Sequence, residues 1–196
     1  MKRINIGIIG LGTVGTGVLR VLKESAVVIR ERLGAELVLK RASDRDIVRD
    51  RGVRLEPGVL TTDALEVIND PDISVVIELV GGTTDAKDFI LKALDAGKHV
   101  VTANKALLST HGPEIFKKAV DKGLDVYFEA SVGGGIPVIK ALREGLAANR
   151  IEAIYGIING TSNYILSKMT HDGGKFEDVL RRAQEKGYAE ADPAYD

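Results

Sequence analysis

The chain has 196 residues, 44% of them hydrophobic and 28% charged, which is the balance of a globular protein with one full domain and part of a second. Its 27 basic and 28 acidic residues leave a formal charge of -1, which argues against a nucleic-acid partner because such proteins usually carry a basic excess. Cysteine is absent, so disulfides and thiolate chemistry are excluded, and no apolar run approaches the roughly 20 residues of a membrane helix; we expect a cytoplasmic protein without a membrane partner.

The first part of the chain predicts a buried strand followed by a long helix. Residues 4–9 form an apolar run rich in β-branched side chains, as in strands buried on both faces. Apolar residues then recur from Val14 to Leu33, mostly at three- and four-residue spacings, with charged residues between them. This spacing predicts one amphipathic helix, and residues 36–42 predict a second strand.

The middle of the chain repeats the alternation of strand and helix. Further strands are predicted at residues 59–61, 74–80, 99–102 and 125–129, and helices after Asp63 and at residues 86–96 and 113–122. Gly97 and Gly123 are expected to end the two longer helices. This alternation predicts an α/β fold over residues 1–130, a Rossmann-type doubly wound parallel sheet with helices on both faces.

After residue 130 the rhythm changes, and we expect a second domain over residues 131–196. Helices are predicted at residues 137–146, 164–171 and 176–186, and a longer strand at residues 151–158. A strand of this length needs sheet partners, and the remaining sequence supplies few. We therefore expect the beginning of an α+β domain that is incomplete in this chain.

A glycine-rich segment directly follows the first predicted strand and opens the first predicted helix. It matches the pattern G-x-G-x-x-G and consists of Gly10, Leu11, Gly12, Thr13, Val14 and Gly15. Gly10 permits a tight turn, Gly12 lets the backbone approach a pyrophosphate, and Gly15 lets helix and strand pack closely. The helix N-terminus favours the phosphates, so we predict a dinucleotide site rather than a ligand-free turn. A methyltransferase loop usually follows an acidic residue at the end of the first strand, and residues 6–9 contain none.

The end of the second predicted strand bears on the choice between NAD and NADP. Asp44 is suited to accept hydrogen bonds from a ribose 2′-hydroxyl, whereas Arg45 is suited to pair with a 2′-phosphate. Both residues are also ordinary solvated loop charges in many proteins. The sequence therefore leaves the form of the cofactor open.

Five later segments carry a resemblance to a known family. They are ELVGGT at residues 78–83, GKHVVTANK at 97–105, EASVGGGIP at 129–137, NGTSNYI at 159–165 and GYAEADP at 187–193. Together with the glycine-rich segment, they make the chain similar to homoserine dehydrogenase from Ile4 to its end. The resemblance implies an NAD(P)-dependent oxidoreductase that interconverts L-aspartate 4-semialdehyde and L-homoserine by hydride transfer in threonine, isoleucine and methionine biosynthesis. It also implies a homodimer in the full-length protein, with residues 131–196 belonging to a substrate and dimerisation domain.

The resemblance assigns roles to residues near the carboxyl edge of the sheet. Lys105 would contact both cofactor and substrate, where a lysine can stabilise a developing oxyanion or relay a proton. Gly82 and Thr83 would line the nicotinamide ribose. Without the family match, a lysine after a strand is usually a solvated charge.

The resemblance also implies an amino-acid pocket and a cation loop. Glu190 would accept hydrogen bonds from the substrate ammonium group and act with Lys105 as a catalytic residue. The other expected substrate-binding residues are Gly160, Thr161, Tyr188 and Asp196. The carboxylate of Glu129 and the backbone carbonyls of Val132, Gly134 and Ile136 would bind a sodium ion with a structural role, a donor set suited to a hard cation. The alternative for residues 131–137 is a helix-entry turn without an ion.

The family match also suggests what lies beyond this chain. In the family, the lysine that donates the proton lies a few residues past the position of Asp196, so we expect a fragment that binds dinucleotide with little turnover. A related sugar or amino-acid dehydrogenase commonly has Glu-Lys-Pro where this chain has Ala-Asn-Lys. A dinucleotide-sensing module, the non-enzymatic alternative, would need neither Lys105 nor Glu190.

Overall fold

The computed structural model describes residues 1–157 and 159–189, and its chain divides into two compact units, residues 1–145 and 146–196. The first unit holds the sheet and the second holds a pair of helices. The predicted domain boundary at residue 130 stays a prediction, because these units are defined by packing alone. Within the described residues, no helix is both long and apolar enough to cross a membrane.

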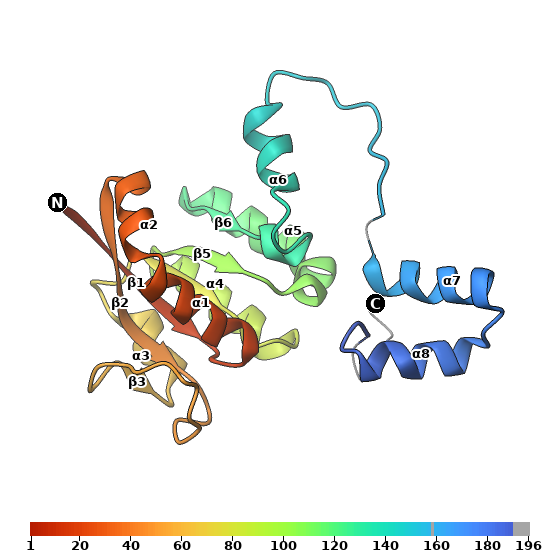
Figure 1. The fold of residues 1–196 in the computed structure, drawn as a ribbon. Helices are drawn as coiled ribbons and strands as arrows, with labels where there is room; N and C mark the ends of the chain where they lie inside the picture. The colour runs from red at the N-terminus through yellow and green to blue at the C-terminus, as the bar shows by residue number, and fades with distance from the viewer. Residues whose placement is uncertain (158, 190–196) are drawn as a thin grey trace. The chain divides into compact units, whose positions relative to one another are not determined.

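The first unit is built on a six-stranded sheet in which every strand pair is parallel. The strands are β1 (Lys2–Ile9), β2 (Ala35–Ser43), β3 (Leu60–Thr61), β4 (Val75–Glu78), β5 (His99–Thr102) and β6 (Val126–Tyr127). Their order is β3-β2-β1-β4-β5-β6 (Figure 1). The order reverses between β1 and β4, the point at which such sheets open a crevice at their carboxyl ends. The predicted Rossmann-type fold is thereby confirmed.

Helices cover both faces of the sheet (Figure 1). The chain after β1 forms α1 (Thr13–Glu24) and α2 (Ala26–Leu33), and the helices after β3, β4 and β5 are α3 (Ala64–Asn69), α4 (Thr84–Asp95) and α5 (Lys105–Lys122). Ile8 and Ile9 point to opposite faces of β1 and join different cores, one packed against Leu19 of α1 and the other against Ile90 of α4 and Ile115 of α5. Apolar side chains on both faces explain the unbroken apolar run of this strand.

Two helices differ from the sequence-based expectation. The single helix predicted from Val14 to Leu33 is divided at Ser25, which ends α1 and begins α2. Ser25 has a φ of -101° and a ψ of 13°, outside the helical values, and its backbone N–H closes α1 on the Val21 carbonyl oxygen. The helix predicted to start at Pro113 instead begins at Lys105, and Pro113 lies inside it. Buried Leu107 and Ile115 on either side hold the helix through the proline, so packing overrides the local preference.

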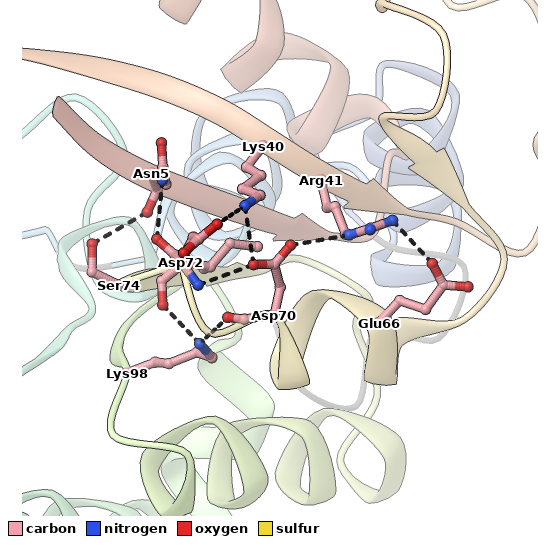
Figure 2. A network of polar contacts seen from close by, with 9 residues as sticks. Asn5, Lys40, Arg41, Glu66, Asp70, Asp72, Ser74 and Lys98 are labelled. Atoms are coloured by element: carbon pink, nitrogen blue, oxygen red, sulfur yellow. Dashed lines mark hydrogen bonds and ion pairs between the residues drawn. The ribbon is translucent and has the colours of Figure 1, made fainter.

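A bulge between β1 and β2 lets two neighbouring basic side chains of β2 pair with the same carboxylate in the loop before β4. The pairing register shifts between Ile6 and Gly7, so the adjacent residues Lys40 and Arg41 both reach the carboxylate of Asp70 (Figure 2). Nζ of buried Lys98 donates to the backbone oxygens of Asp70 and Ile73, at 2.6 and 2.7 Å. Asp70 and Lys98 precede β4 and β5, so this network supports the amino ends of the two strands, opposite the crevice.

The chain after β6 forms short helical segments and then the helix pair of the second unit. The segments are Glu129–Ser131, α6 (Val138–Lys140) and a π-helical turn at Ala141–Gly145, and the pair is α7 (Gly160–Asp172) and α8 (Phe176–Glu185). Ile165, Val179 and Ala183 form the core between α7 and α8.

The strand predicted at residues 151–158 is absent from its described part, residues 151–157. Its apolar side chains are exposed, as Ile154 and Tyr155 illustrate at 63% and 94%. A strand needs a neighbour to satisfy its backbone, and the described part of the second unit offers no other strand. The regular elements among the described residues of the expected α+β domain are therefore all helical, and residue 158 lies outside the described residues.

Candidate functional site

The glycine-rich turn lies between β1 and α1, at the reversal point of the sheet. Gly10 has a φ of 97°, and a Cβ there would lie 2.6 Å from the carbonyl carbon of Leu79. A Cβ on Gly15 would lie 2.1 Å from the oxygen of Gly10, whereas a Cβ on Gly12 would have no atom of the described residues within 4 Å. The packing of the chain itself thus requires Gly10 and Gly15. Gly12 instead leaves its bare face open, which is where a pyrophosphate would approach.

A cavity of about 360 Å³ borders this turn and lies within the usual size range of ligand pockets. Its lining joins the turn after β1, the end of β2 and the turn after β4. The polar and glycine residues from these segments are Gly10, Gly12, Ser43, Asp44, Arg45 and Gly81. The structure therefore brings together the glycine-rich turn, both candidates for cofactor choice and the start of the GGT segment.

Asp44 is held on both carboxylate oxygens. The N–H of Leu11 donates to Oδ2 at 2.6 Å, and the N–H of Asp46 donates to Oδ1 at 2.9 Å. Nη2 of Arg51 lies 3.1 Å from Oδ1, and Nε of Arg51 donates to the carbonyl oxygen of Leu11 at 2.9 Å. Both backbone groups of Leu11 are therefore fixed by the Asp44–Arg51 ion pair. Sequence reasoning missed Arg51, because nothing in the spacing distinguishes it from the other arginines of the loop.

The Arg45 side chain is far more exposed than that of Asp44. It is 90% exposed, and Nη2 lies 2.6 Å from Oδ2 of Asp85 in the first turn of α4. The two candidates for the choice between NAD and NADP are accordingly a fixed carboxylate and an exposed guanidinium beside the same cavity.

The ends of β4 and β5 are joined by a ring of hydrogen bonds around Glu78. The Glu78 side chain is fully buried, and it accepts from the Thr102 hydroxyl at 2.7 Å and from the Val80 N–H at 2.8 Å. The hydroxyl oxygen of Thr102 accepts from the Asn104 N–H at 3.1 Å, and the Asn104 side-chain amide donates to the Gly82 carbonyl oxygen at 2.7 Å. Burial raises the pKa of Glu78, and the hydrogen bonds from Thr102, Val80 and Gly81 oppose that rise.

This ring brings the predicted Gly82 and Thr83 close in the fold to the predicted Lys105. Gly81 and Gly82 have φ values of 74° and 69°, a left-handed pair that glycine adopts without strain. Asn104 caps α5 by accepting from the Leu107 N–H at 3.0 Å, and exposed Lys105 is the first residue of that helix. Thr83 occupies the position before α4. Sequence reasoning did not assign roles to Glu78, Thr102 or Asn104, although all three lie in the quoted motifs.

Glu129, the one side-chain ligand of the predicted cation loop, has a helix-capping role. Its Oε1 accepts from the Ile139 N–H at 2.7 Å, and its Oε2 accepts from the Lys140 N–H at 2.9 Å. The carbonyl oxygen of Ile136 accepts from the Val138 N–H at 2.8 Å. The cation site at Glu129, Val132, Gly134 and Ile136 stays a prediction.

In the second unit, the expected pocket residues at the two ends of the helix pair meet. Gly160 begins α7, and the Thr161 hydroxyl donates to the Tyr188 carbonyl oxygen at 2.5 Å. The Tyr188 ring packs edge-on against Tyr164 with centroids 5.2 Å apart. Glu190 and Asp196 lie outside the described residues.

Comparison with known protein families assigns almost the whole chain. The family model described as the NAD binding domain of homoserine dehydrogenase matches residues 10–129, and the model described as homoserine dehydrogenase matches residues 137–196. The chain belongs to the homoserine dehydrogenase family. The first model covers the glycine-rich turn, the cavity and the Glu78 ring, so these features lie in the NAD-binding part of that family.

Individual homoserine dehydrogenases match the full length of this chain. The curated enzyme of Neisseria gonorrhoeae is 52% identical over 196 residues, and that of Bacillus subtilis is 45% identical. The crystal structure of a homoserine dehydrogenase from Thiobacillus denitrificans is 53% identical with a TM-score of 0.91, covering 100% of this chain and 45% of that one. A hyperthermophilic archaeal homoserine dehydrogenase in complex with NADPH has a TM-score of 0.81 at 25% identity, covering 99% of this chain and 64% of that one. The chain spans 45% of the length of the two curated relatives.

Proposed function

We propose that the full-length protein containing this chain is an NAD(P)-dependent homoserine dehydrogenase. It would interconvert L-aspartate 4-semialdehyde and L-homoserine by hydride transfer, in the biosynthesis of threonine, isoleucine and methionine. Membership of the family and 45–52% identity to curated homoserine dehydrogenases support this activity.

The open face of Gly12 is the observation that carries the cofactor part of the proposal. Glycine at this position serves no packing need of the described chain, and it lies where α1 begins. The backbone amides of residues 10–15 would hold a pyrophosphate there, aided by the positive end of the helix dipole. Asp44 or Arg45 would contact the adenosine ribose, and Gly82 and Thr83 the nicotinamide ribose. When bound, the nicotinamide supplies or accepts the hydride.

Lys105 is the proposed catalytic residue of the first unit. Its ammonium group would stabilise the alkoxide oxygen that develops at the former aldehyde, or relay a proton to it. Its place after β5 puts it at the carboxyl edge of the sheet, where folds of this class bind ligands. Gly160, Thr161, Tyr188, Glu190 and Asp196 are proposed to bind the amino-acid end of the substrate, with Glu190 receiving its ammonium group.

Two further proposals concern assembly and the cation. We propose that the full-length protein is a homodimer, and the exposed apolar side chains of residues 151–157 are consistent with burial against a partner. A sodium ion at Glu129 would have a structural role, and no chemical step passes through it.

The test uses the full-length protein. NADH and NADPH are titrated separately by nucleotide fluorescence, and homoserine oxidation is followed through the absorbance of the reduced nicotinamide. Lys105→Ala should lower turnover by about 10²–10³ while leaving dinucleotide binding measurable. If the wild-type protein binds dinucleotide but oxidises no homoserine, and Lys105→Ala leaves the bound-state signal unchanged, the protein is a sensing module and the proposed enzyme is wrong.

A further inference from the structure

Glu78 is a buried carboxyl group that the proposed chemistry does not use. It ends β4 on the carboxyl edge of the sheet, and its exposure is 0%. Burying a carboxyl group costs stability unless its oxygens are hydrogen-bonded, and here both oxygens accept. A β-branched apolar residue, like its neighbours in β4, would fill such a position without that cost. The presence of a carboxyl group at this buried position therefore needs an explanation other than packing.

The hydrogen bonds of Glu78 run in both directions from the strand end. On one side, Oε1 accepts from the Val80 N–H and fixes the start of the turn that contains Gly81 and Gly82. On the other side, Oε2 accepts from the Thr102 hydroxyl at the end of β5. Val80 thus opens the turn that the proposed function uses for the nicotinamide ribose, and Thr102 ends the strand that leads to Lys105.

Asn104 completes the ring of hydrogen bonds around Glu78. Its backbone N–H donates to the Thr102 hydroxyl oxygen, and its side-chain amide donates to the carbonyl oxygen of Gly82. Asn104 also caps α5, so the same residue determines where Lys105 starts its helix. The Gly82 turn and the start of α5 are thus joined through the hydrogen bonds of Glu78, Thr102 and Asn104.

We propose that Glu78 is a positioning residue that, through Thr102 and Asn104, holds the nicotinamide-side turn in register with Lys105. The inference rests on the proposed function and deepens it. Glu78 acts on hydride transfer and not on the adenosine end of the cofactor, whose proposed contacts, Asp44 and Arg45, lie in the loop after β2. The ring needs both side-chain oxygens of Glu78 as hydrogen-bond acceptors. Glutamine has an NH₂ donor in place of one of these oxygens.

The experiment compares Glu78→Gln, Thr102→Val and the double variant with the wild-type full-length protein. Binding of ADP-ribose and its 2′-phosphate measures the adenosine end of the site, and binding of NADH and NADPH measures the whole site. The value of kcat and the deuterium isotope effect on hydride transfer measure the chemical step. Glu78→Gln is expected to lower kcat on the order of 10- to 100-fold and to raise the isotope effect, because a small misplacement of reacting groups is costly. The dissociation constant of the ADP-ribose probe should stay within about twofold of the wild-type value. A twofold change corresponds to a free energy of RT ln 2, which is smaller than the energy of a typical contact. Thr102→Val should act similarly, and the two effects should be non-additive because both residues belong to one ring.

Lys98→Met is the matched control. Lys98 is also a buried ionisable residue beside β4 and β5, at 3% exposure, but it lies at the opposite edge of the sheet. It should lower the melting temperature without changing kcat. A Glu78→Gln protein with wild-type kcat, or with equal losses for ADP-ribose and NADH, would overturn the positioning role. A wild-type protein that binds no dinucleotide would instead overturn the proposed function itself.

Discussion

The Arg51 guanidinium spans from the Asp44 carboxylate to the Leu11 carbonyl oxygen, with distances of 3.1 and 2.9 Å. Its side chain is only 7% exposed, and the arrangement ties the loop after β2 to the middle of the glycine-rich turn. Asp44 completes the link by accepting the N–H of Leu11. Asp44, which is expected to hydrogen-bond the ribose, thus also helps to hold the glycine-rich turn in place.

Replacing Arg51 should therefore weaken binding of both nicotinamide cofactors. Arg51→Gln keeps a polar side chain but removes the charge and the fork that holds Asp44 and Leu11 together. We expect the dissociation constants of NADH and NADPH to rise together by about tenfold, equivalent to ~1.4 kcal/mol. Isothermal titration of both cofactors measures this. Arg54→Gln, an exposed arginine in the same loop, is the control, and a rise for only one cofactor would contradict the support role.

Gly12 and Gly15 should separate binding from stability. Gly15→Ala places a methyl group 2.1 Å from the Gly10 oxygen, so it should destabilise the first unit by roughly 1–3 kcal/mol through overpacking. Gly12→Ala meets no described atom and should leave the urea midpoint of the protein near wild type. It should nevertheless weaken dinucleotide binding by at least about tenfold, because the methyl group occupies the approach of the pyrophosphate. Unchanged affinity in folded Gly12→Ala would remove the main support for the phosphate site.

The sequence predicted the sheet and the glycine-rich turn because both depend on local pattern. Apolar runs such as residues 4–9 define strands buried on both faces, and the contact that requires Gly15, with the Gly10 oxygen, lies within the same βα unit. Asp63 likewise caps α3 as expected, accepting from the Leu65 N–H at 2.8 Å.

The supporting residues of the site depend on long-range contacts that local pattern does not contain. Arg51 reaches Leu11 and Asp44 across a loop, and Asn104 reaches Gly82 in the preceding turn. Residues 151–157 show the opposite failure, because their apolar pattern suits a strand but the described chain provides no strand to pair with it. Glu190 and Asp196 were named from the family resemblance, and they lie outside the described residues.

The charged network of Figure 2 predicts an acid-dependent loss of stability. Burial acts to raise the pKa of Asp70, but hydrogen bonds from the Asp72 N–H, Arg41 and Lys40 lower it overall. A carboxyl group whose folded pKa is depressed stabilises the protein above its unfolded pKa of about 4, and that contribution is lost as pH falls through the folded pKa.

Asp70→Asn should therefore cost roughly 1–2 kcal/mol at neutral pH, and the cost should shrink below about pH 4. Urea unfolding measured at several pH values gives the difference between variant and wild type. Asp88→Asn breaks an exposed i,i+4 pair with Lys92 and should change stability by less than about 0.5 kcal/mol at any pH. A cost for Asp70→Asn that is the same at pH 3 and pH 7 would show that its charge is not responsible.

Glu129 allows the capping role and the predicted cation role to be distinguished. Its two oxygens accept from the Ile139 and Lys140 amides, so Glu129→Gln, which retains one acceptor oxygen, should release one of these amides. We expect faster hydrogen exchange at residues 139 and 140 and a stability loss of about 1 kcal/mol, typical of a lost helix cap. If sodium also binds the carboxylate, the wild-type protein will be more stable in sodium chloride than in choline chloride at equal ionic strength, and Glu129→Gln will lose that difference. If both proteins respond identically to the two salts while the exchange rates still change, Glu129 acts as a cap alone and the cation prediction is wrong.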